Sequence, residues 1–321
     1  MSTESWRPTA TRAVLEARAS FLARVRAFFR ARHVLEVDTP LLVNHAVSDV
    51  HIHSARVAGS GGAVLFLHTS PEYAMKRLLA AGSGDIFQIC HVVRAFERSR
   101  LHNSEFTLLE WYRTGFSLDD LMREVEALVR ELAPGLAGGN TEHVSYREAF
   151  EREFGLDPLE AELADLAASA TAAGLVSDRG AAHGRDDLLD FLMAARIGPK
   201  LGKAGLTFVH GYPASQAALA RLDPVDGRTA LRFELYAQGV ELANGYHELA
   251  SADRQRERFD SDNAERKRRG LAAVTLDPYL LAALAHLPDC AGVALGLDRL
   301  LMLALGASVI DEVLAFPTER A

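Results

Sequence analysis

The stretch Gly292-Val-Ala-Leu-Gly-Leu-Asp-Arg-Leu-Leu-Met-Leu-Ala-Leu-Gly306 joins two different patterns. Its first residues are typical of a short strand, and residues 297–305 are typical of a helix that is apolar on every side and therefore buried. Arg299 stands at the entrance to that helix, where an unpaired guanidinium would cost several kcal/mol. Either a neighbouring carboxylate pairs with Arg299 while Asp298 caps the helix, or an anionic or aromatic ligand binds there.

The bulk properties are those of a soluble globular protein. The chain has 321 residues, a formal net charge of −8 and only two cysteines, which lie far apart in sequence. It is long enough for one large domain or two ordinary ones, and it has no long basic tract for nonspecific binding of nucleic acid. Residues 1–8 lack the apolar core of a secretion signal, and the apolar run 293–305 is too short to span a membrane. We therefore expect a cytoplasmic protein without a disulfide framework.

Helices and strands are mixed along the rest of the chain. Apolar spacing predicts strands over residues 33–40, 64–68, 86–94, 105–112 and 207–213 and helices over residues 11–33, 117–133, 157–173 and 186–197. The Ala- and Leu-rich stretch at about 150–205 contains no chemical motif, and we interpret it as an inserted helical subdomain. Residues 251–269 are typical of a solvated, charged helix.

The segment Ser70-Pro71-Glu72 follows the buried strand 64–68 directly. Ser70 suits a helix N-cap, Pro71 the first helical position, and Glu72 the first turn, where a carboxylate meets the positive end of the helix dipole. Alternatively, Glu72 faces a cavity beyond the end of the strand and receives a cationic group of a substrate. The local pattern leaves both interpretations open.

The loop 95–103 between two predicted strands is too long for a tight turn and unusually rich in charge. Its one acidic acceptor is Glu97. The cationic donors in and beside the loop are Arg94, Arg98, Arg100 and His102. It is either a solvated hairpin tip or a loop that binds an anion. In the strand that follows, Glu110 and Tyr112 share one face because side chains alternate with a period of two, so they form a small polar site.

Residues 232–249 predict a hairpin whose two-residue turn is Gln238-Gly239. In that register Glu234 is the diagonal neighbour of Glu241 on one face. Two like charges in this arrangement destabilise a sheet unless a cation lies between them, so the pair is a candidate Mg²⁺ site completed by phosphate oxygens. A solvated face is the alternative. Asn244 and Glu248, which follow in an apolar context, favour the metal.

Three separate stretches thus require the same kind of ligand. The loop 95–103 offers cations for phosphates, the hairpin offers acids for Mg²⁺, and Arg299 needs a partner. A nucleoside triphosphate with its metal satisfies all three, because phosphoryl and nucleotidyl chemistry depends on positioning and charge stabilisation. The sequence contains no P-loop, glycine-rich kinase loop or dinucleotide fingerprint, and no Ser/His/Asp or Cys/His set indicates a covalent nucleophile.

These stretches resemble the three motifs of class II aminoacyl-tRNA synthetases of the lysyl type. Residues 35–40 (LEVDTP) resemble motif 1, residues 94–110 resemble motif 2, and residues 292–299 (GVALGLDR) resemble motif 3. The resemblance spans nearly the whole chain, and motif 1 begins almost at the first residue. We therefore expect a single class II synthetase-like catalytic domain over residues 1–321, with the helical insertion and without an anticodon-binding domain. Such an organisation resembles the truncated paralogues that modify elongation factor P.

The resemblance implies an α+β fold in which an antiparallel β-sheet is flanked by helices, and a homodimer formed through motif 1. It implies an ATP-dependent, AMP-forming ligase that requires Mg²⁺. The substrate would be lysine or (R)-β-lysine, and the acceptor would be the ε-amine of a lysine on elongation factor P, with tRNA and membranes not involved. The alternatives are a stand-alone lysyl-tRNA synthetase-like or amino-acid amidating enzyme, and an inactive sensor of nucleotide or amino acid.

Carried over by position, the resemblance also implies residue roles. The implied catalytic residues are Arg94 and Arg299. The implied ATP-binding residues are Arg94, Phe96, Glu97, Arg100, His102, Asn103, Glu241, Leu242, Gly296 and Arg299. The implied substrate-binding residues are Ser70, Pro71, Glu72, Tyr112, Asn244 and Glu248, and the implied Mg²⁺ ligands are Glu234 and Glu241. The chain departs from the family at Phe96, where motif 2 usually has an acid that reads adenine, so either Glu97 or backbone groups take that role. Asp298 is interpreted as a helix cap.

Overall fold

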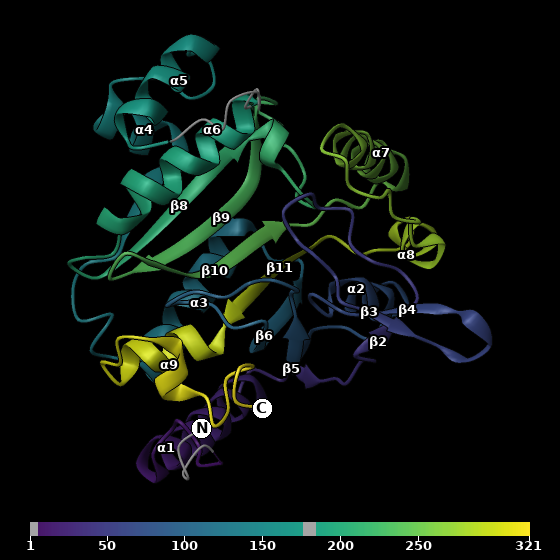
Figure 1. The fold of residues 1–321 in the computed structure, drawn as a ribbon, viewed down its shortest axis with the longest axis vertical. Helices are drawn as coiled ribbons and strands as arrows, with labels where there is room; N and C mark the ends of the chain where they lie inside the picture. Colours follow the sequence, from purple (N-terminus) through teal and green to yellow (C-terminus); the bar gives the residue numbers. More distant parts are fainter. Residues whose placement is uncertain (1–5, 176–183) are drawn as a thin grey trace. The chain divides into compact units, whose positions relative to one another are not determined.

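The computed structural model describes residues 6–175 and 184–321. The chain divides into two compact units, of which unit 1 comprises Met1–Ser117 and Glu248–Ala321 and unit 2 comprises Leu118–His247. Each unit has its own strands and helices and is described by itself (Figure 1). Two parts of the sequence predictions, residues 1–5 of the N-terminal segment and residues 176–183 of the helical insertion, lie outside the described residues.

The strands of unit 1 form two sheets. The larger sheet has the order β1-β5-β6-β11, and the smaller has the order β2-β4-β3. The bounds are Leu35–Glu36 (β1), Leu42–Val43 (β2), Arg56–Ala58 (β3), Val64–Leu67 (β4), Ile86–Val93 (β5), Glu105–Thr114 (β6) and Cys290–Gly296 (β11). β1 runs parallel to β5, whereas the pairs β5–β6 and β6–β11 are antiparallel. The predicted strands at 64–68, 86–94 and 105–112 are therefore confirmed.

Among the described residues of unit 1, five α-helices accompany these sheets, namely α1 (Arg12–Arg30), α2 (Glu72–Ala80), α7 (Ala252–Arg268), α8 (Pro278–Leu284) and α9 (Leu297–Ala304). α1 covers one face of the larger sheet. Its Phe29 ring stacks on Phe87 of β5 with ring centroids 4.5 Å apart and meets Trp111 of β6 edge-on at 5.3 Å. Side chains alternate along a strand, so the residues on either side of Trp111 project from the opposite face of the sheet.

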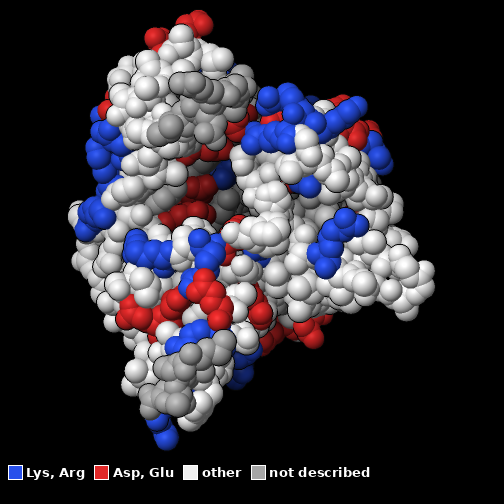
Figure 2. All heavy atoms as spheres, in the orientation of Figure 1, with Lys and Arg blue, Asp and Glu red and all other residues white. Residues whose placement is uncertain are grey.

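α7 is the charged helix expected at residues 251–269. Ser251 caps it, and its side chain accepts a hydrogen bond from the Arg254 backbone N–H. Lys and Arg side chains gather over α7 on the face shown in Figure 2. Only a few of its side chains, Phe259 among them, are buried against unit 1, so the helix is solvated along most of its surface.

The strands of unit 2 follow the order β10-β9-β8-β7, with bounds Glu142–Ser145 (β7), Leu206–Pro213 (β8), Thr229–Ala237 (β9) and Val240–His247 (β10). Its helices are α3 (Leu118–Leu132), α4 (Tyr146–Phe154), α5 (Leu163–Ala172) and α6 (Arg185–Leu192). A buried cluster that includes Phe150, Leu189 and Val209 joins α4, α6 and β8. The insertion thus has its own apolar core, but the helix predicted at 157–173 begins only at Leu163.

The hairpin β9–β10 has the predicted turn and register. Ala237 pairs with Val240 and Tyr236 pairs with Glu241. The register then shifts at Leu242, a bulge that was not predicted, and Asn244 pairs with Glu234. The bulge adds one residue to β10, so Glu241 and Asn244 point to the same face although they are three residues apart. Glu234 lies on that face too.

The ends of two further helices differ from the prediction. α2 begins at Glu72 with Pro71 as its N-cap residue, although the Ser70 hydroxyl still accepts a hydrogen bond from the Glu72 backbone N–H at 3.3 Å. α9 ends at Ala304, one residue before the predicted end, and Ala304 is itself exposed, so this helix is not buried on every side. Across the two described ranges, 6–175 and 184–321, every helix is too short or too polar to cross a lipid bilayer.

Candidate active site

The face of the larger unit 1 sheet that points away from α1 carries the candidate site. The strand register places Tyr112 opposite Gly292, and it places Glu110 between Gln88 on one side and Ala294 on the other. The Tyr112 hydroxyl donates a hydrogen bond to Glu110 Oε1 at 2.7 Å. The predicted shared face of Glu110 and Tyr112 is therefore confirmed.

β11 has small residues at alternate positions, and at Gly292 the absence of a side chain is required. A Cβ atom built at Gly292 would lie 2.3 Å from two ring atoms of Tyr112 and 2.7 Å from Glu248 Oε1. Such distances are far below van der Waals contact, so Gly292 is what allows Tyr112 and Glu248 to approach each other over the strand.

Lys76 places an ammonium group of the protein itself between two of the predicted substrate-binding acids. Its Nζ atom is 2.7 Å from Glu72 Oε1 and 2.6 Å from Glu248 Oε2, and the residue is 1 % exposed. Burial lowers the pKa of Lys76, but the Glu248 and Glu72 carboxylates outweigh burial and raise this pKa above its ordinary value. Lys76 therefore stays charged and holds both carboxylates in place.

Glu110 is a third carboxylate in the same place. Glu110 Oε2 and Glu248 Oε1 are buried and accept no hydrogen bond from any residue in the described part of the chain. Burial, followed by the charge of Glu72, raises the pKa of Glu110 to about 8, and burial raises the pKa of Glu248 as well. Three carboxylates thus share one ammonium group, and two of their oxygens are open to a further cation.

Sequence reasoning missed Lys76 and Gln88. The spacing of Glu72 and Lys76, four residues apart on a helix, is a signal for an ion pair that could have found Lys76. Gln88 is buried directly opposite Glu110 on the neighbouring strand. A glutamine in a strand carries no chemical signal of its own, so only the register reveals it.

Arg94, at the end of β5, joins the predicted motif 2 to the segment before α2. Its guanidinium lies over the Phe106 ring, with Cζ 5.2 Å from the ring centroid, and its Nε donates to the Thr69 carbonyl at 3.4 Å. This cation–π contact orients the Arg94 guanidinium and uses none of its outer N–H donors.

Arg299 meets the loop 95–103. Its Nε donates to the Leu101 carbonyl at 3.3 Å, and its Nη2 donates to His102 Nε2. His102 therefore carries its proton on Nδ1, which donates to Ser99 Oγ at 2.7 Å. Burial, followed by the charges of Arg299 and Arg94, lowers the pKa of His102 to about 4. His102 is thus a neutral group that orients Arg299, and the expectation that it supplies a positive charge is wrong.

Asp298 is not the helix cap that the sequence predicts. Gly296 occupies the N-cap position of α9, and Asp298 lies in the first turn. Its carboxylate accepts hydrogen bonds from Arg18 of α1 at 2.6 Å and from the Thr107 backbone N–H at 2.7 Å. Asp298 is therefore a buried ion-pair partner that connects α9 to α1 and β6. The sequence pattern could not reveal this role, because the partner Arg18 lies 280 residues away.

The remaining loop residues have structural contacts. Arg100 Nη1 donates to the Ser308 carbonyl at 2.8 Å, and buried Asn103 bonds the Glu105 carbonyl at 2.7 Å and the Thr318 N–H at 3.1 Å. Phe96 has a φ angle of 70° and is 89 % exposed, and the Glu97 carbonyl accepts from Ser104 Oγ. A positive φ at a bulky residue stores strain in the predicted ATP loop.

In unit 2 the hairpin β9–β10 presents side-chain oxygen atoms on one face. Glu234 accepts hydrogen bonds from Arg232 and from the Tyr236 hydroxyl, the latter at 2.7 Å, and the buried Asn244 Oδ1 has no partner within the described ranges. In the described part of the chain no three His, Cys, Asp or Glu residues are grouped to hold a metal. Both Glu234 oxygens thus already accept hydrogen bonds, so Glu234 would hold Mg²⁺ only by exchanging these partners for the ion, which commonly takes one or two carboxylates and completes its shell with water and phosphate. Leu242 is buried at the bulge.

Comparison with known proteins adds to this geometry. The family model described as tRNA synthetases class II (D, K and N) matches residues 3–320. The chain is 48 % identical to the elongation factor P–(R)-β-lysine ligase of Vibrio cholerae, over the full length of both chains. It is 46 % identical to the ligases of the same name from Yersinia enterocolitica and Klebsiella pneumoniae, with 99 % of each chain covered.

Proposed function

The chain belongs to the class II tRNA synthetase family, and we propose that it activates (R)-β-lysine or lysine with ATP and attaches it to elongation factor P. The predicted family and its fold, a mixed and mostly antiparallel sheet with flanking helices, are confirmed by the match over residues 3–320. The relatives named as elongation factor P–(R)-β-lysine ligases support the substrate and the acceptor.

The observation that carries the proposal is the excess of carboxylates on the unit 1 sheet. Glu72 and Glu248 pair with the ammonium group of Lys76, and Glu110 lies near enough to interact electrostatically with all three. Within the described residues, Glu110 Oε2 and Glu248 Oε1 have no hydrogen-bond partner. A buried carboxylate is stabilised when a cation pairs with it, and a hydrogen bond between two charged groups is stronger than one between neutral groups. A substrate with two ammonium groups supplies the missing charge. Ser70, Pro71, Tyr112 and Asn244 remain proposed substrate contacts.

The reaction has two steps. In the first, an oxygen of the substrate carboxylate attacks the α-phosphorus of ATP, a new O–P bond forms, and the bond to the β-phosphate oxygen breaks to release pyrophosphate. In the second, the ε-amine of a lysine on elongation factor P attacks the carbonyl carbon of the adenylate. A C–N bond forms, AMP leaves with the electron pair of the C–O bond, and the amine loses a proton. Catalysis then consists of positioning and charge stabilisation.

Arg94 and Arg299 are the proposed catalytic residues. Arg94 keeps N–H donors for the α-phosphate while Phe106 orients it, and His102 orients Arg299. The other proposed ATP contacts are Phe96, Glu97, Arg100, Asn103, Glu241, Leu242 and Gly296. Backbone groups near Phe96 or the Glu97 side chain would read adenine.

We also propose that Glu234 and Glu241 bind Mg²⁺, which supplies charge stabilisation for the phosphates when bound. A homodimer formed through motif 1 is supported by apolar side chains that are exposed in and beside β1, β2 and β4, namely Leu35, Leu41, Leu42 and Val64. The organisation as one catalytic domain with an insertion at about 150–205, and a location in the cytoplasm, belong to the same proposal.

The test is a labelling experiment with two acceptors. The protein is incubated with radiolabelled (R)-β-lysine or lysine and ATP, together with either elongation factor P or tRNA. We expect label in elongation factor P and none in tRNA. Label in tRNA alone would establish a lysyl-tRNA synthetase instead, and ATP binding without label in either acceptor would establish a sensor.

A further inference from the structure

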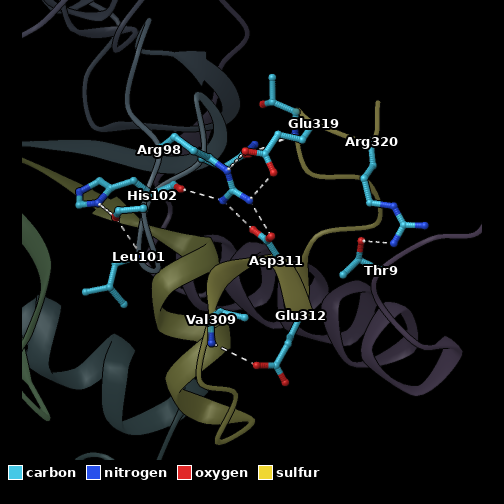
Figure 3. Close-up of polar contacts among 12 residues, drawn as sticks. Thr9, Arg98, Leu101, His102, Val309, Asp311, Glu312, Glu319 and Arg320 are labelled. Atoms are coloured by element: carbon cyan, nitrogen blue, oxygen red, sulfur yellow. Dashed lines mark hydrogen bonds and ion pairs between the residues drawn. The ribbon is translucent and has the colours of Figure 1, made fainter. Parts of the chain in front are cut away.

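Arg98, at the outer part of the loop 95–103, joins two acids of the segment 308–320 (Figure 3). Its Nη1 and Nη2 donate to the two carboxylate oxygens of Asp311 at 2.8 and 2.7 Å. Its Nε and Nη2 donate to the two carboxylate oxygens of Glu319, each at 3.1 Å. One planar guanidinium thus holds both acids through paired hydrogen bonds, which fix orientation as well as distance.

The same guanidinium also holds the loop itself. Arg98 Nη1 donates to the His102 carbonyl at 3.3 Å, so it bridges the loop to the segment 308–320. Two hydrogen bonds donated by backbone N–H groups run alongside, from Ile310 to the Arg100 carbonyl at 2.9 Å and from Thr318 to the side-chain Oδ1 of Asn103 at 3.1 Å. The conformation that presents His102 to Arg299 is therefore held from outside the loop as well as by the hydrogen bonds between Ser99 and His102 within it.

The segment 308–320 is itself anchored. The Thr9 and Ala10 N–H groups donate to the carbonyls of Ala315 and Leu314 at 2.9 and 3.2 Å, just before α1. Arg320 Nη2 donates to the Arg7 carbonyl at 2.9 Å, and its Nη1 bonds the Thr9 hydroxyl, as Figure 3 shows. A segment held at several points by backbone hydrogen bonds is a firm base from which Asp311 and Glu319 can position the loop.

The charges support the contact. Hydrogen bonds from Arg98 lower the pKa of Glu319, and the side chain of Arg98 is 30 % exposed. Water and salt weaken ion pairs that are this exposed, so the contact is a weak source of global stability. Its larger effect is to restrict the conformations of the nine-residue loop 95–103, which includes Arg100 and His102.

We propose that Arg98, Asp311 and Glu319 are positioning residues of the ATP site, which hold the loop 95–103 in the conformation that receives the phosphates. This inference rests on the proposed function. None of the three residues touches the reacting atoms, so their loss raises the KM for ATP and has little effect on the KM for the amino acid.

The test uses the double variant Asp311→Asn/Glu319→Gln, which removes both negative charges and keeps the shapes. ATP–pyrophosphate exchange is measured for both substrates, and the Kd of Mg-ATP is measured by calorimetry. We expect KM and Kd for ATP to rise about 3- to 10-fold, and the KM for (R)-β-lysine to change less than about 2-fold. The conservative variant Asp311→Glu/Glu319→Asp keeps the charges and restores most of the ATP affinity.

The matched control is Asp226→Asn/Glu160→Gln in unit 2, where Arg228 pairs with these two exposed acids in a similar way. This control leaves ATP affinity unchanged. Unchanged ATP affinity in the Asp311/Glu319 variant would overturn the inference, as would equal losses for ATP and amino acid. If the wild-type protein shows no exchange, the proposed function fails, and the calorimetric comparison still decides the role of Arg98.

Discussion

Lys76 is the residue on which the candidate substrate site depends. It is one of the largest fully buried side chains of the described chain, and it pairs with Glu72 and Glu248. A family motif predicts Glu72, Tyr112 and Glu248 from the sequence, because each lies in a recognisable stretch. The ion pair of Glu72 with Lys76 follows a spacing of four residues on a helix, and the strand period places Glu110 beside Tyr112. The approach of Glu248 to Lys76 could not be predicted, because it depends on how distant segments align.

Replacing Lys76 with methionine leaves two buried carboxylates without their cation. We expect Lys76→Met to lower the free energy of unfolding by about 3–5 kcal/mol, measured by denaturant titration. The control is Lys200→Met, which removes an ion pair with Glu153 whose lysine side chain is 61 % exposed, and we expect it to cost less than about 1 kcal/mol. Equal losses in the two variants would contradict the structural role of Lys76.

Glu110 predicts a pH dependence of substrate binding. Its pKa is raised from 4.5 to about 8, so the empty site binds a proton at neutral pH that a substrate ammonium group must displace. The KM for (R)-β-lysine should therefore fall as pH rises from about 6 to 8, by up to about tenfold per pH unit. The raised pKa of Glu110 also makes the free energy of unfolding decrease as pH rises from about 6 to 8, because the folded protein holds this proton more tightly than the unfolded chain. Glu110→Gln reduces this pH dependence but leaves the share that comes from Glu248, whose pKa burial also raises. A profile unchanged by that variant would contradict the assignment.

Among the elements, β11 makes room for the site, and Gly292 tests this. A methyl group at this position would lie 2.3 Å from the buried Tyr112 ring, so Gly292→Ala must displace Tyr112 or Glu248. We expect a loss of about 1–3 kcal/mol of stability in thermal unfolding, together with reduced exchange activity. For stability, the control is Gly296→Ala, whose methyl group would lie 3.8 Å from its nearest neighbour, the Arg299 side chain. Similar stability losses in both variants would show that strand conformation, and not the Tyr112 contact, explains the effect.

The elements themselves were largely predictable from periodicity and turn residues. The hairpin β9–β10 shows why, since Gln238-Gly239 specifies the turn and the turn specifies the register up to Glu241. Its bulge at Leu242 leaves no such signal. The cap of α9 was predicted wrongly because Asp298 pairs with Arg18, and a short polar residue at a helix start has the same pattern in either role.

For the whole molecule, the order of three motifs along one chain predicted the family, and the match over residues 3–320 confirms it. The division into Met1–Ser117 with Glu248–Ala321 and Leu118–His247 was not predicted, because the chain leaves unit 1 and returns to it without a change in composition. The assignment of ATP and Mg²⁺ contacts to single residues stays a prediction.

The central claim is that the acids around Lys76 select a diammonium amino acid for activation by ATP. ATP–pyrophosphate exchange with (R)-β-lysine, compared with an analogue of equal length that lacks the terminal ammonium group, tests it most directly. We predict exchange with (R)-β-lysine and at least about 100-fold less with the analogue, because the acids would then be left unpaired. Equal exchange with both compounds, or none with (R)-β-lysine or lysine, would contradict it.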